Sequence, residues 1–456
     1  MKWGLFLFLS FSCFWTQAQV ATQLKRAMES FNADEQTQHA LVSLYVVDAG
    51  SGEVVFDQNS DLGMATASTE KIITAATAFA VLGKDFTYET KIGIISTPKG
   101  KSLYVVPSGD PTLASWRWEE TKDAVFLSKL KAAVQQNGIK ELNSIILYTG
   151  QWGQQTIPGA WIWEDLGNYY GAGAQAVNWR ENQFDLVLRS GVPGSPVTVV
   201  KTTPHLYDYT IMSRAVAGSA SSGDNSNLYY PSMGARTGIL TGSIPSGKND
   251  FVVSGSLYDP ANQFVRTIIA ELKGIVHFTT DKVVTTDQEE KNVNWVFTNQ
   301  SPGLSKIIYW FLRKSVNLYG EALLKTIGLK QKGLGTTANG IEAETTYWKD
   351  KGIDPDALHL YDGSGLSPQN RITTKAQVTV LQYARQQPWF ADYYEAFPLY
   401  NDMKMKSGTI NRVKGFSGYQ KSKEGKNYIF SMLVNNYNGS QLSLVRKMYN
   451  VLDVLK

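Results

Sequence analysis

The character of the sequence changes twice along the chain, and this change constrains the fold more than any other feature. Helical hydrophobic periodicity occurs near both ends, whereas residues 92–295 contain short β-rich runs separated by clusters of Gly, Pro, Ser and Asn. Residues 41–61, directly before the first helical run that ends at Gly83, read as a β-hairpin around a Gly-Ser-Gly turn. The order predicts one α/β domain, formed by the two ends of the chain and split in sequence by a β-rich insertion.

The first 18 residues have the features of a secretory signal peptide. Lys2 precedes a short apolar stretch, and Thr16–Ala18 offers small residues for cleavage after Ala18. The apolar stretch is short for a bilayer, which disfavours a membrane anchor. A lipoprotein cleaved before Cys13 is a weaker alternative, because the residues before Cys13 fit that signal poorly. Removal of the signal would leave no cysteine and no transmembrane segment.

Charge and motif content exclude several classes of function. The 456 residues include 44 Lys and Arg against 40 Asp and Glu, with no basic stripe, so we expect no nucleic-acid partner. The 4 histidines are scattered without a His-x-x-x-His pair, which disfavours a metal site. The sequence also lacks a P-loop and a Gly-x-Ser-x-Gly elbow. We therefore expect no metal and no cofactor.

Ser68 and Lys71 lie at the start of an apolar run with helical spacing. The run begins at Ile72 and ends at Gly83, a residue typical of helix C-termini. Residues three apart share one face of a helix, so the two polar side chains can meet. A chain of this length contains about two Ser-x-x-Lys matches by chance. Taken alone, the stretch favours a helix N-cap and a solvent-exposed charge.

Two further short motifs follow the insertion. Ser315-Val316-Asn317 alone favours a polar break between two helices, and Lys406-Ser407-Gly408-Thr409 alone favours a strand with a glycine at a close contact. The three motifs occur in the order Ser-x-x-Lys, Ser-x-Asn and Lys-Ser-Gly, on a helix start, an interhelical break and a strand. A closely similar trio is the signature of serine β-lactamases and penicillin-binding proteins.

Acyl transfer explains the residue types of the trio. A serine hydroxyl needs an adjacent base, and a desolvated lysine can serve as one. We expect Lys406 to lower the pKa of Lys71, because like charges disfavour the protonated form. The Ser315 hydroxyl can relay a proton, and Asn317 can hold an amide. A strand-edge N–H near Thr409 and the N–H of the nucleophile can form an oxyanion hole.

The chain resembles the class C low-molecular-mass penicillin-binding proteins, the D-alanyl-D-alanine carboxypeptidase/endopeptidases. Besides the trio, SGDPTL at 108–113, the sequence around Ser315 and DGSGLSPQNRIT at 362–373 are similar to family segments. The resemblance spans nearly the whole mature chain. It implies an α/β fold: a transpeptidase/β-lactamase-like domain, with an antiparallel sheet flanked by helices, interrupted by two inserted β-rich domains. The expected ranges are 1–18 for the signal peptide, 19–91 and 296–456 for the catalytic domain, 92–183 and 258–295 for inserted domain II, and 184–257 for inserted domain III.

The resemblance implies a periplasmic serine DD-peptidase that acts on peptidoglycan stem peptides. Ser68 would attack the penultimate D-alanine and form an acyl-enzyme, with Lys71 as the base. Ser315 would protonate the leaving amine, and Asn317 would position the substrate or the deacylating water. β-Lactam antibiotics such as penicillin would be covalent inhibitors that acylate the same serine. The residues implied to bind the terminal carboxylate, with the glycine between them, are Lys406, Ser407, Gly408 and Thr409.

The sequence also departs from the family pattern and leaves alternatives open. Val316 stands where Asp or Asn is frequent, and Tyr148 stands where several relatives carry an Asp that helps recognise the substrate's diamino acid. The Tyr148 difference bears on peptide preference rather than on acyl chemistry, and the sequence does not decide whether Val316 alters activity. Two alternatives are a penicillin-recognising hydrolase of another substrate, such as a β-lactamase or D-specific esterase, and a non-catalytic wall-binding relative. The sequence does not choose between carboxypeptidase and endopeptidase activity.

Overall fold

The computed structural model describes residues 4–230, 232 and 234–456. Residues 1–3 and the side chains of residues 4–17, which belong to the expected signal peptide, lie outside the description. In the described part, no helix combines the length and the apolar character needed to cross a membrane.

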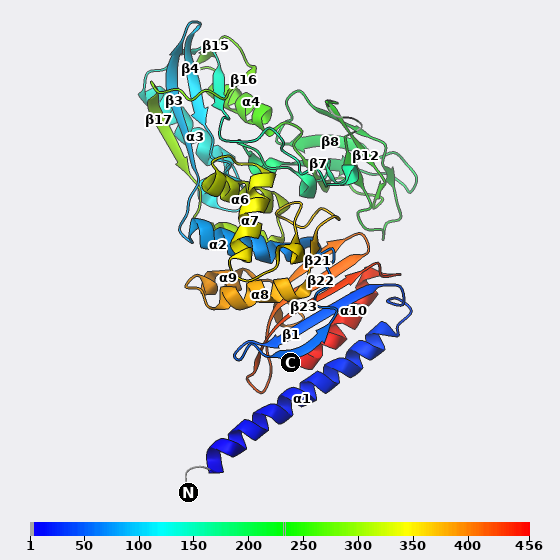
Figure 1. Ribbon diagram of the computed structural model, residues 1–456. Helices are drawn as coiled ribbons and strands as arrows, with labels where there is room; N and C mark the ends of the chain where they lie inside the picture. The colour runs from blue at the N-terminus through cyan, green and yellow to red at the C-terminus, as the bar shows by residue number, and fades with distance from the viewer. Residues whose placement is uncertain (1–3, 231, 233) are drawn as a thin grey trace. The chain divides into compact units, whose positions relative to one another are not determined.

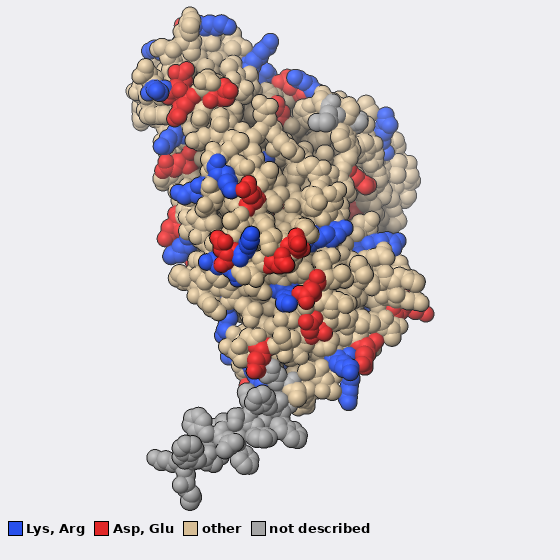
Figure 2. All heavy atoms as spheres, viewed as in Figure 1, with Lys and Arg blue, Asp and Glu red and all other residues tan. Residues whose placement is uncertain are grey.

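The chain folds into two compact units, each assembled from separate stretches of sequence (Figure 1). The first unit comprises Met1–Lys84, Ile308–Val316 and Ile341–Lys456. The second unit comprises Asp85–Ile307 and Asn317–Gly340. Charged side chains of both signs are interspersed on the face shown in Figure 2.

A six-stranded antiparallel sheet forms the centre of the first unit, in the order β2-β1-β23-β22-β21-β20. The expected hairpin at 41–61 is confirmed, since β1 pairs with β2. Strand β1 also pairs with β23, so the two ends of the chain share one sheet. The strands are β1 (Leu41–Asp48), β2 (Val54–Gln58), β20 (Leu399–Tyr400), β21 (Met403–Ile410), β22 (Val413–Lys421) and β23 (Asn427–Asn435).

Helices cover both faces of this sheet (Figure 1). On one face, α1 (Gly4–Asn32) and α10 (Gln441–Leu452) contribute Leu24 and Leu444 to a hydrophobic core with sheet residues such as Phe430. On the other face, α8 (Thr374–Arg385) packs on β1 and β23, and α2 (Lys71–Leu82) packs on α8. Because both faces are covered, the central strands are buried on both sides, and Val42–Val47 is buried throughout. Two further helices are α7 (Thr337–Lys349) and α9 (Phe390–Ala396).

The second unit is β-rich, as expected for the insertion. A five-stranded sheet has the order β16-β6-β4-β3-β17, and two three-stranded sheets have the orders β14-β7-β8 and β11-β12-β9. The strands expected from FDLVLRSG, PVTVVKTT and DFVVSGSLYD are β7, β8 and β14, and they pair with one another. The bounds are β3 (Glu89–Thr97), β4 (Gly100–Val106), β6 (Ile145–Tyr148), β7 (Gln183–Arg189), β8 (Thr198–Thr203), β9 (Thr210–Ser213), β11 (Asn227–Tyr229), β12 (Thr237–Thr241), β14 (Phe251–Ser256), β16 (Val283–Thr286) and β17 (Asn294–Gln300).

One continuous hydrophobic core unites these sheets. It extends from Ile92 on β3 through Phe184 on β7 and Leu240 on β12 to Phe264 on α4. The helices of this unit are α3 (Asp123–Gln136), α4 (Pro260–Leu272) and α6 (Asn317–Lys332), and α5 (Leu304–Lys314) precedes α6. The predicted fold class, a transpeptidase-like α/β domain with additional β-rich parts, is confirmed. The boundary between inserted domains II and III stays a prediction.

Candidate active site

Ser68 lies in a single 3₁₀ turn, Ala67–Glu70, that leads directly into α2. The turn begins with an unusual backbone, because Ala67 has a φ of 45°, a left-handed conformation that is uncommon outside glycine. The Thr69 hydroxyl donates to the Thr66 carbonyl at 2.8 Å and accepts from Gln377 at 2.9 Å. Gln377 is itself buried on α8. The turn is therefore held in place by hydrogen bonds below it.

Two glycines allow other segments to approach the Ser68 turn closely. A Cβ at Gly408 on β21 would lie 2.4 Å from the Thr66 carbonyl oxygen and 3.0 Å from the Ser68 nitrogen. A Cβ at Gly365 would lie 1.9 Å from the Ala67 carbonyl oxygen, and Gly365 has a φ of +79°. All three distances are below van der Waals contact. The glycine of Lys-Ser-Gly is therefore a steric requirement of the site.

Lys71 points toward the serine and is completely buried. Its Nζ donates to Ser68 Oγ at 2.9 Å and to the Ser364 carbonyl oxygen at 2.5 Å. The Phe311 ring lies 5.9 Å from Nζ. The interpretation of Lys71 as a solvent-exposed charge is wrong. No side-chain capping hydrogen bond marks the start of the turn or of α2, so Ser68 is not an N-cap either.

The loop that supplies the Ser364 carbonyl is organised by Asp362. Its buried carboxylate accepts backbone N–H groups of Ser364 at 3.1 Å, Gly365 at 2.7 Å and Ser367 at 2.6 Å. Such bonds from an aspartate to following amides are typical of tight turns. The sequence marked this segment as similar to the family, but its contact with Lys71 became visible only in the structure.

Lys406 forms the second serine–lysine pair of the site. Its buried Nζ donates to Ser315 Oγ at 2.9 Å and to the Ser407 carbonyl oxygen at 2.7 Å. Ser315 lies between α5 and α6 with a φ of 58°. Burial holds the pKa of Lys406 well below its usual value, and the charges of Lys71 and Lys414 lower that pKa further. The expected lowering of the Lys71 pKa by Lys406 stays a prediction.

Ser407 and Thr409 lie on an open stretch of sheet edge. Strand β20 pairs only with Met403 and Lys404, so the rest of β21 is not covered by β20. The Met405 N–H points to this side, because it donates to the Pro398 carbonyl at 3.1 Å. N–H groups of alternate residues point the same way in an antiparallel strand. The backbone N–H groups of Ser407 and Thr409 therefore face the open edge.

Lys414 is a candidate residue that the sequence analysis missed. It pairs with Thr409 across the β21–β22 hairpin, and its Nζ donates to Thr409 Oγ1 at 2.8 Å. Burial lowers the pKa of Lys414 to about 8. Among the described residues, neither Lys414 nor Lys406 forms an ion pair with a carboxylate. The two-residue Asn411-Arg412 turn was the available signal, because hairpin register would place Lys414 opposite Thr409.

Comparison with known proteins assigns the family. The model of the D-Ala-D-Ala carboxypeptidase 3 (S13) family matches residues 24–401. The chain belongs to this family. It is 26% identical to a D-alanyl-D-alanine carboxypeptidase of Actinomadura sp. (strain R39), over 92% of this chain and 82% of the relative. It is 21% identical to D-alanyl-D-alanine carboxypeptidase DacB of Haemophilus influenzae, over 88% of this chain and 86% of the relative.

Solved structures share the fold. The crystal structure of penicillin binding protein 4 (dacB) from Haemophilus influenzae has a TM-score of 0.77 at 19% identity, and the match covers 95% of this chain and 98% of that chain. The predicted resemblance to class C penicillin-binding proteins is thereby confirmed. The S13 protein is a serine-type D-alanyl-D-alanine peptidase that acts on peptidoglycan.

Asn317, the last residue of the Ser-x-Asn motif, begins α6 in the second unit. It is largely buried, and its Nδ2 donates to the Tyr170 carbonyl oxygen at 2.8 Å. This bond fixes the orientation of the side-chain amide. Tyr148, the other position of interest for peptide preference, ends β6 with its ring 6.4 Å from that of Tyr104. Among the described residues, no group of three or more His, Cys, Asp or Glu side chains is arranged to hold a metal ion.

Proposed function

We propose that this S13 peptidase cleaves D-alanyl-D-alanine termini in the periplasm through an acyl-enzyme on Ser68. The observation that carries the proposal is the contact of 2.9 Å between Lys71 Nζ and Ser68 Oγ, made by a lysine with no exposed surface. A lysine in such surroundings acts as a base when it is neutral. The turn and the helix start hold the serine rigidly, as a nucleophile requires.

In the acylation step, Ser68 Oγ forms a bond to the carbonyl carbon of the penultimate D-alanine while neutral Lys71 accepts the hydroxyl proton. Collapse of the tetrahedral intermediate breaks the C–N bond, and the amine of the terminal D-alanine needs a proton. In our proposal Ser315 delivers it, and the proton that Lys71 accepted replaces the one that Ser315 gives up. Because Lys406 donates a hydrogen bond to Ser315 Oγ, the hydroxyl hydrogen of Ser315 points away from Lys406 and can be donated to another group. Water then hydrolyses the ester and restores Ser68.

The negative charge on the carbonyl oxygen needs donors that are in place before the reaction. The Ser68 N–H and the edge-facing N–H of Thr409 meet this requirement in our proposal. The close contact of Gly408 with the Ser68 turn supports it, because that contact brings β21 next to the nucleophile. Asn317 keeps the role that the family resemblance implies, which is to position the substrate or the deacylating water.

The carboxylate of the terminal D-alanine binds along the β21 edge in our proposal. In their protonated forms Lys406 and Lys414 would provide positive charge there, and among the described residues neither forms an ion pair with a carboxylate. Lys414 also orients a hydroxyl: because its ammonium donates to Thr409 Oγ1, the hydroxyl hydrogen of Thr409 is available for an anionic ligand. Ser407 supplies a second hydroxyl and an edge N–H.

Intact-protein mass measurement after incubation with penicillin tests the nucleophile. We expect one covalent adduct on the wild-type protein and none on Ser68→Ala. The folded state of the variant is checked by circular dichroism. A wild-type protein that is folded but forms no adduct, or an adduct that persists in Ser68→Ala, contradicts the proposal. Digestion of purified muropeptides then shows whether terminal D-alanine, cross-linked peptide or both are cleaved.

A further inference from the structure

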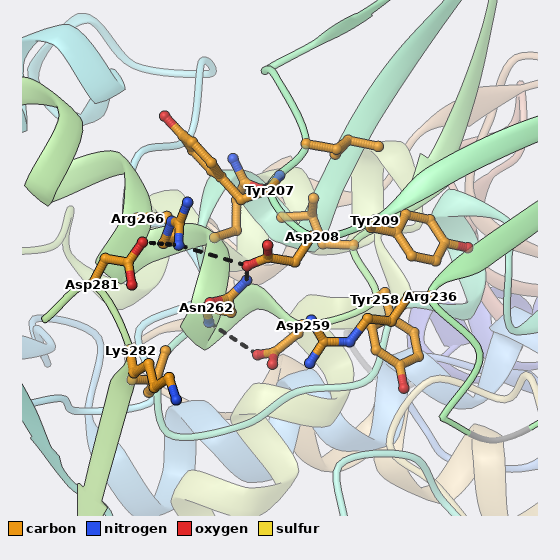
Figure 3. Close-up of a pocket in the computed structure, with 14 residues that line it drawn as sticks. Tyr207, Asp208, Tyr209, Arg236, Tyr258, Asp259, Asn262, Arg266, Asp281 and Lys282 are labelled. Carbon is orange, nitrogen blue, oxygen red and sulfur yellow. Dashed lines mark hydrogen bonds and ion pairs between the residues drawn. The ribbon is translucent and has the colours of Figure 1, made fainter.

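A separate pocket lies in the second unit, at the meeting point of five segments (Figure 3). Its volume is about 520 Å³, within the range of small-molecule sites. The segments are the loop between β8 and β9, the start of β12, the loop after β14, the first turns of α4, and the start of β16. The side chains used below are Tyr207, Asp208, Arg236, Tyr258, Asn262 and Arg266.

The polar groups of the pocket are held in fixed orientations. The Arg266 guanidinium pairs with Asp281, lies 3.9 Å from a carboxylate oxygen of Asp208, and stacks 5.3 Å from the Tyr207 ring (Figure 3). Asn262 Nδ2 donates to Asp208 at 3.2 Å. Asp208 has a φ of 56°, an uncommon backbone conformation for a residue other than glycine. Strained positions of this kind concentrate at ligand sites.

The charges that line the pocket balance one another. Asp208, Asp259 and Asp281 face three basic side chains, those of Arg236, Arg266 and Lys282. An anionic or cationic ligand would be attracted by one set and repelled by the other. A neutral ligand that both donates and accepts hydrogen bonds uses both sets.

Aromatic rings add an apolar surface to these polar groups. Tyr258 is partly exposed in the pocket, and its ring stacks on Tyr209 at 5.3 Å with an interplanar angle of 2°. Tyr207 lies at another part of the wall (Figure 3). Rigid rings beside fixed hydrogen-bonding groups suit a ligand with an apolar face and a polar rim. A sugar ring has this form.

We propose that this pocket binds the uncharged amino-sugar backbone of peptidoglycan. The polymer that the enzyme acts on carries its peptides on a glycan chain, so a glycan site would hold the enzyme on its polymeric substrate. Such a second attachment raises the effective concentration of the attached peptides without adding any contact at Ser68. The pocket and the reaction at Ser68 are therefore separable by experiment.

The test uses the full chain with tetra-N-acetylchitotetraose and with peptide-free glycan strands as probes. We expect saturable binding by NMR or calorimetry. Arg236→Ala should weaken it about tenfold, the effect of losing one hydrogen bond to a charged group, and Asn262→Ala about fivefold, the effect of losing a neutral one. Arg214→Ala is the matched control, because Arg214 is an exposed arginine of the same β-rich part and does not line the pocket.

Activity provides a second readout. Arg236→Ala is expected to release D-alanine from a short soluble peptide at the wild-type rate and from intact sacculi more slowly. Absence of saturable glycan binding by the wild type overturns the inference, as do Arg236→Ala and Asn262→Ala variants that bind as the wild type does. A free stem peptide that displaces the glycan from the pocket also overturns it. Penicillin acylation of Ser68 reports on the proposed function independently.

Discussion

Two buried lysines, one in each unit, have similarly lowered pKa values and different hydrogen-bond partners. In the second unit, burial lowers the pKa of Lys325 to about 8, and in the first unit it lowers the pKa of Lys414 to about 8. Lys325 Nζ donates to three backbone carbonyls, those of Gln155 at 2.8 Å, Thr156 at 3.2 Å and Ala174 at 2.6 Å. Lys414 donates to the hydroxyl of Thr409, and Lys406 donates to the hydroxyl of Ser315 as well as to the Ser407 carbonyl.

The difference separates a lysine that holds a loop in place from lysines that are candidates for a role in the reaction. Lys325 ties a long loop to α6 and uses its three donors on rigid acceptors. A hydroxyl that accepts a hydrogen bond from a lysine can still donate one to a ligand. The hydrogen bonds of Lys406 and Lys414 can therefore continue through the hydroxyls of Ser315 and Thr409 to a bound ligand. A lowered lysine pKa therefore does not by itself identify a catalytic site, whereas the chemistry of the partners does.

The largest expected effect comes from Lys71→Met. This change removes the base while keeping an unbranched side chain, and we expect acylation by penicillin to slow by at least about 10³-fold. Stopped-flow or quenched gel assays with labelled penicillin measure the rate. A variant that acylates within tenfold of the wild type would show that Lys71 is not the base.

Lys325→Met is the contrasting variant. It leaves buried carbonyl oxygens without their donor, which destabilises the fold by about 2 to 4 kcal/mol. The acylation rate of the folded protein should stay near the wild-type value. Urea unfolding gives the stability and the penicillin assay gives the rate. A Lys325→Met variant that loses acylation but keeps its stability would contradict the assignment of Lys325 as a structural lysine.

The next effect in size is expected for Gly408→Ala. The new methyl group would press on Thr66 and on the Ser68 nitrogen, so the turn must shift and the proposed oxyanion donors separate. We expect kcat/KM on a D-alanyl-D-alanine peptide to fall about 10²-fold, since displacement of about 1 Å is enough for such a loss. Gly223→Ala is the control, because no atom lies within 4 Å of its Cβ position. Equal activity of the two variants would exclude the steric argument.

A smaller effect is expected for Lys414→Met. Loss of the ammonium removes charge beside Thr409 and frees the orientation of its hydroxyl, so KM for peptides with a free terminal carboxylate should rise about tenfold with kcat little changed. Substrates with an amidated terminus should not distinguish the variant from the wild type. Lys414→Arg should restore most of the binding. A fall in kcat on both substrates would indicate a merely structural role.

The smallest effect is a pH dependence of substrate binding. With a pKa of about 8, Lys414 is charged below pH 8 and neutral above it. We therefore expect KM for carboxylate-bearing peptides to increase as the pH rises through about 8, and the increase to be absent in Lys414→Met. Because the folded pKa is lowered, the unfolded chain binds more protons between about pH 8 and 10.5, so this group makes stability rise with pH in that window. A flat KM profile across pH 7 to 9 would contradict the assignment.

Much of the fold follows from local patterns. Hydrophobic periodicity and turn residues located the hairpin at 41–61, the helix that ends before Gly83 and the strands β7, β8 and β14, since these depend on neighbours in sequence. The order of the three motifs, together with their local structure, was enough to indicate acyl-transfer chemistry at Ser68. The boundary between the inserted domains stays a prediction, and one hydrophobic core runs through both segments.

The arrangement of charge and protons at the site was decided by tertiary structure alone. The sequence around Ser68 favours an N-cap and an exposed lysine, yet Lys71 is buried because a carbonyl 293 residues away accepts its hydrogen bond. Lys406 donates a hydrogen bond to Ser315, which is 91 residues away in sequence. The register of the β21–β22 hairpin places Lys414 opposite Thr409. The sequence motifs identify which side chains can take part in the reaction. Burial and partners, which set the pKa and the direction of each hydroxyl, arise only when distant segments pack together.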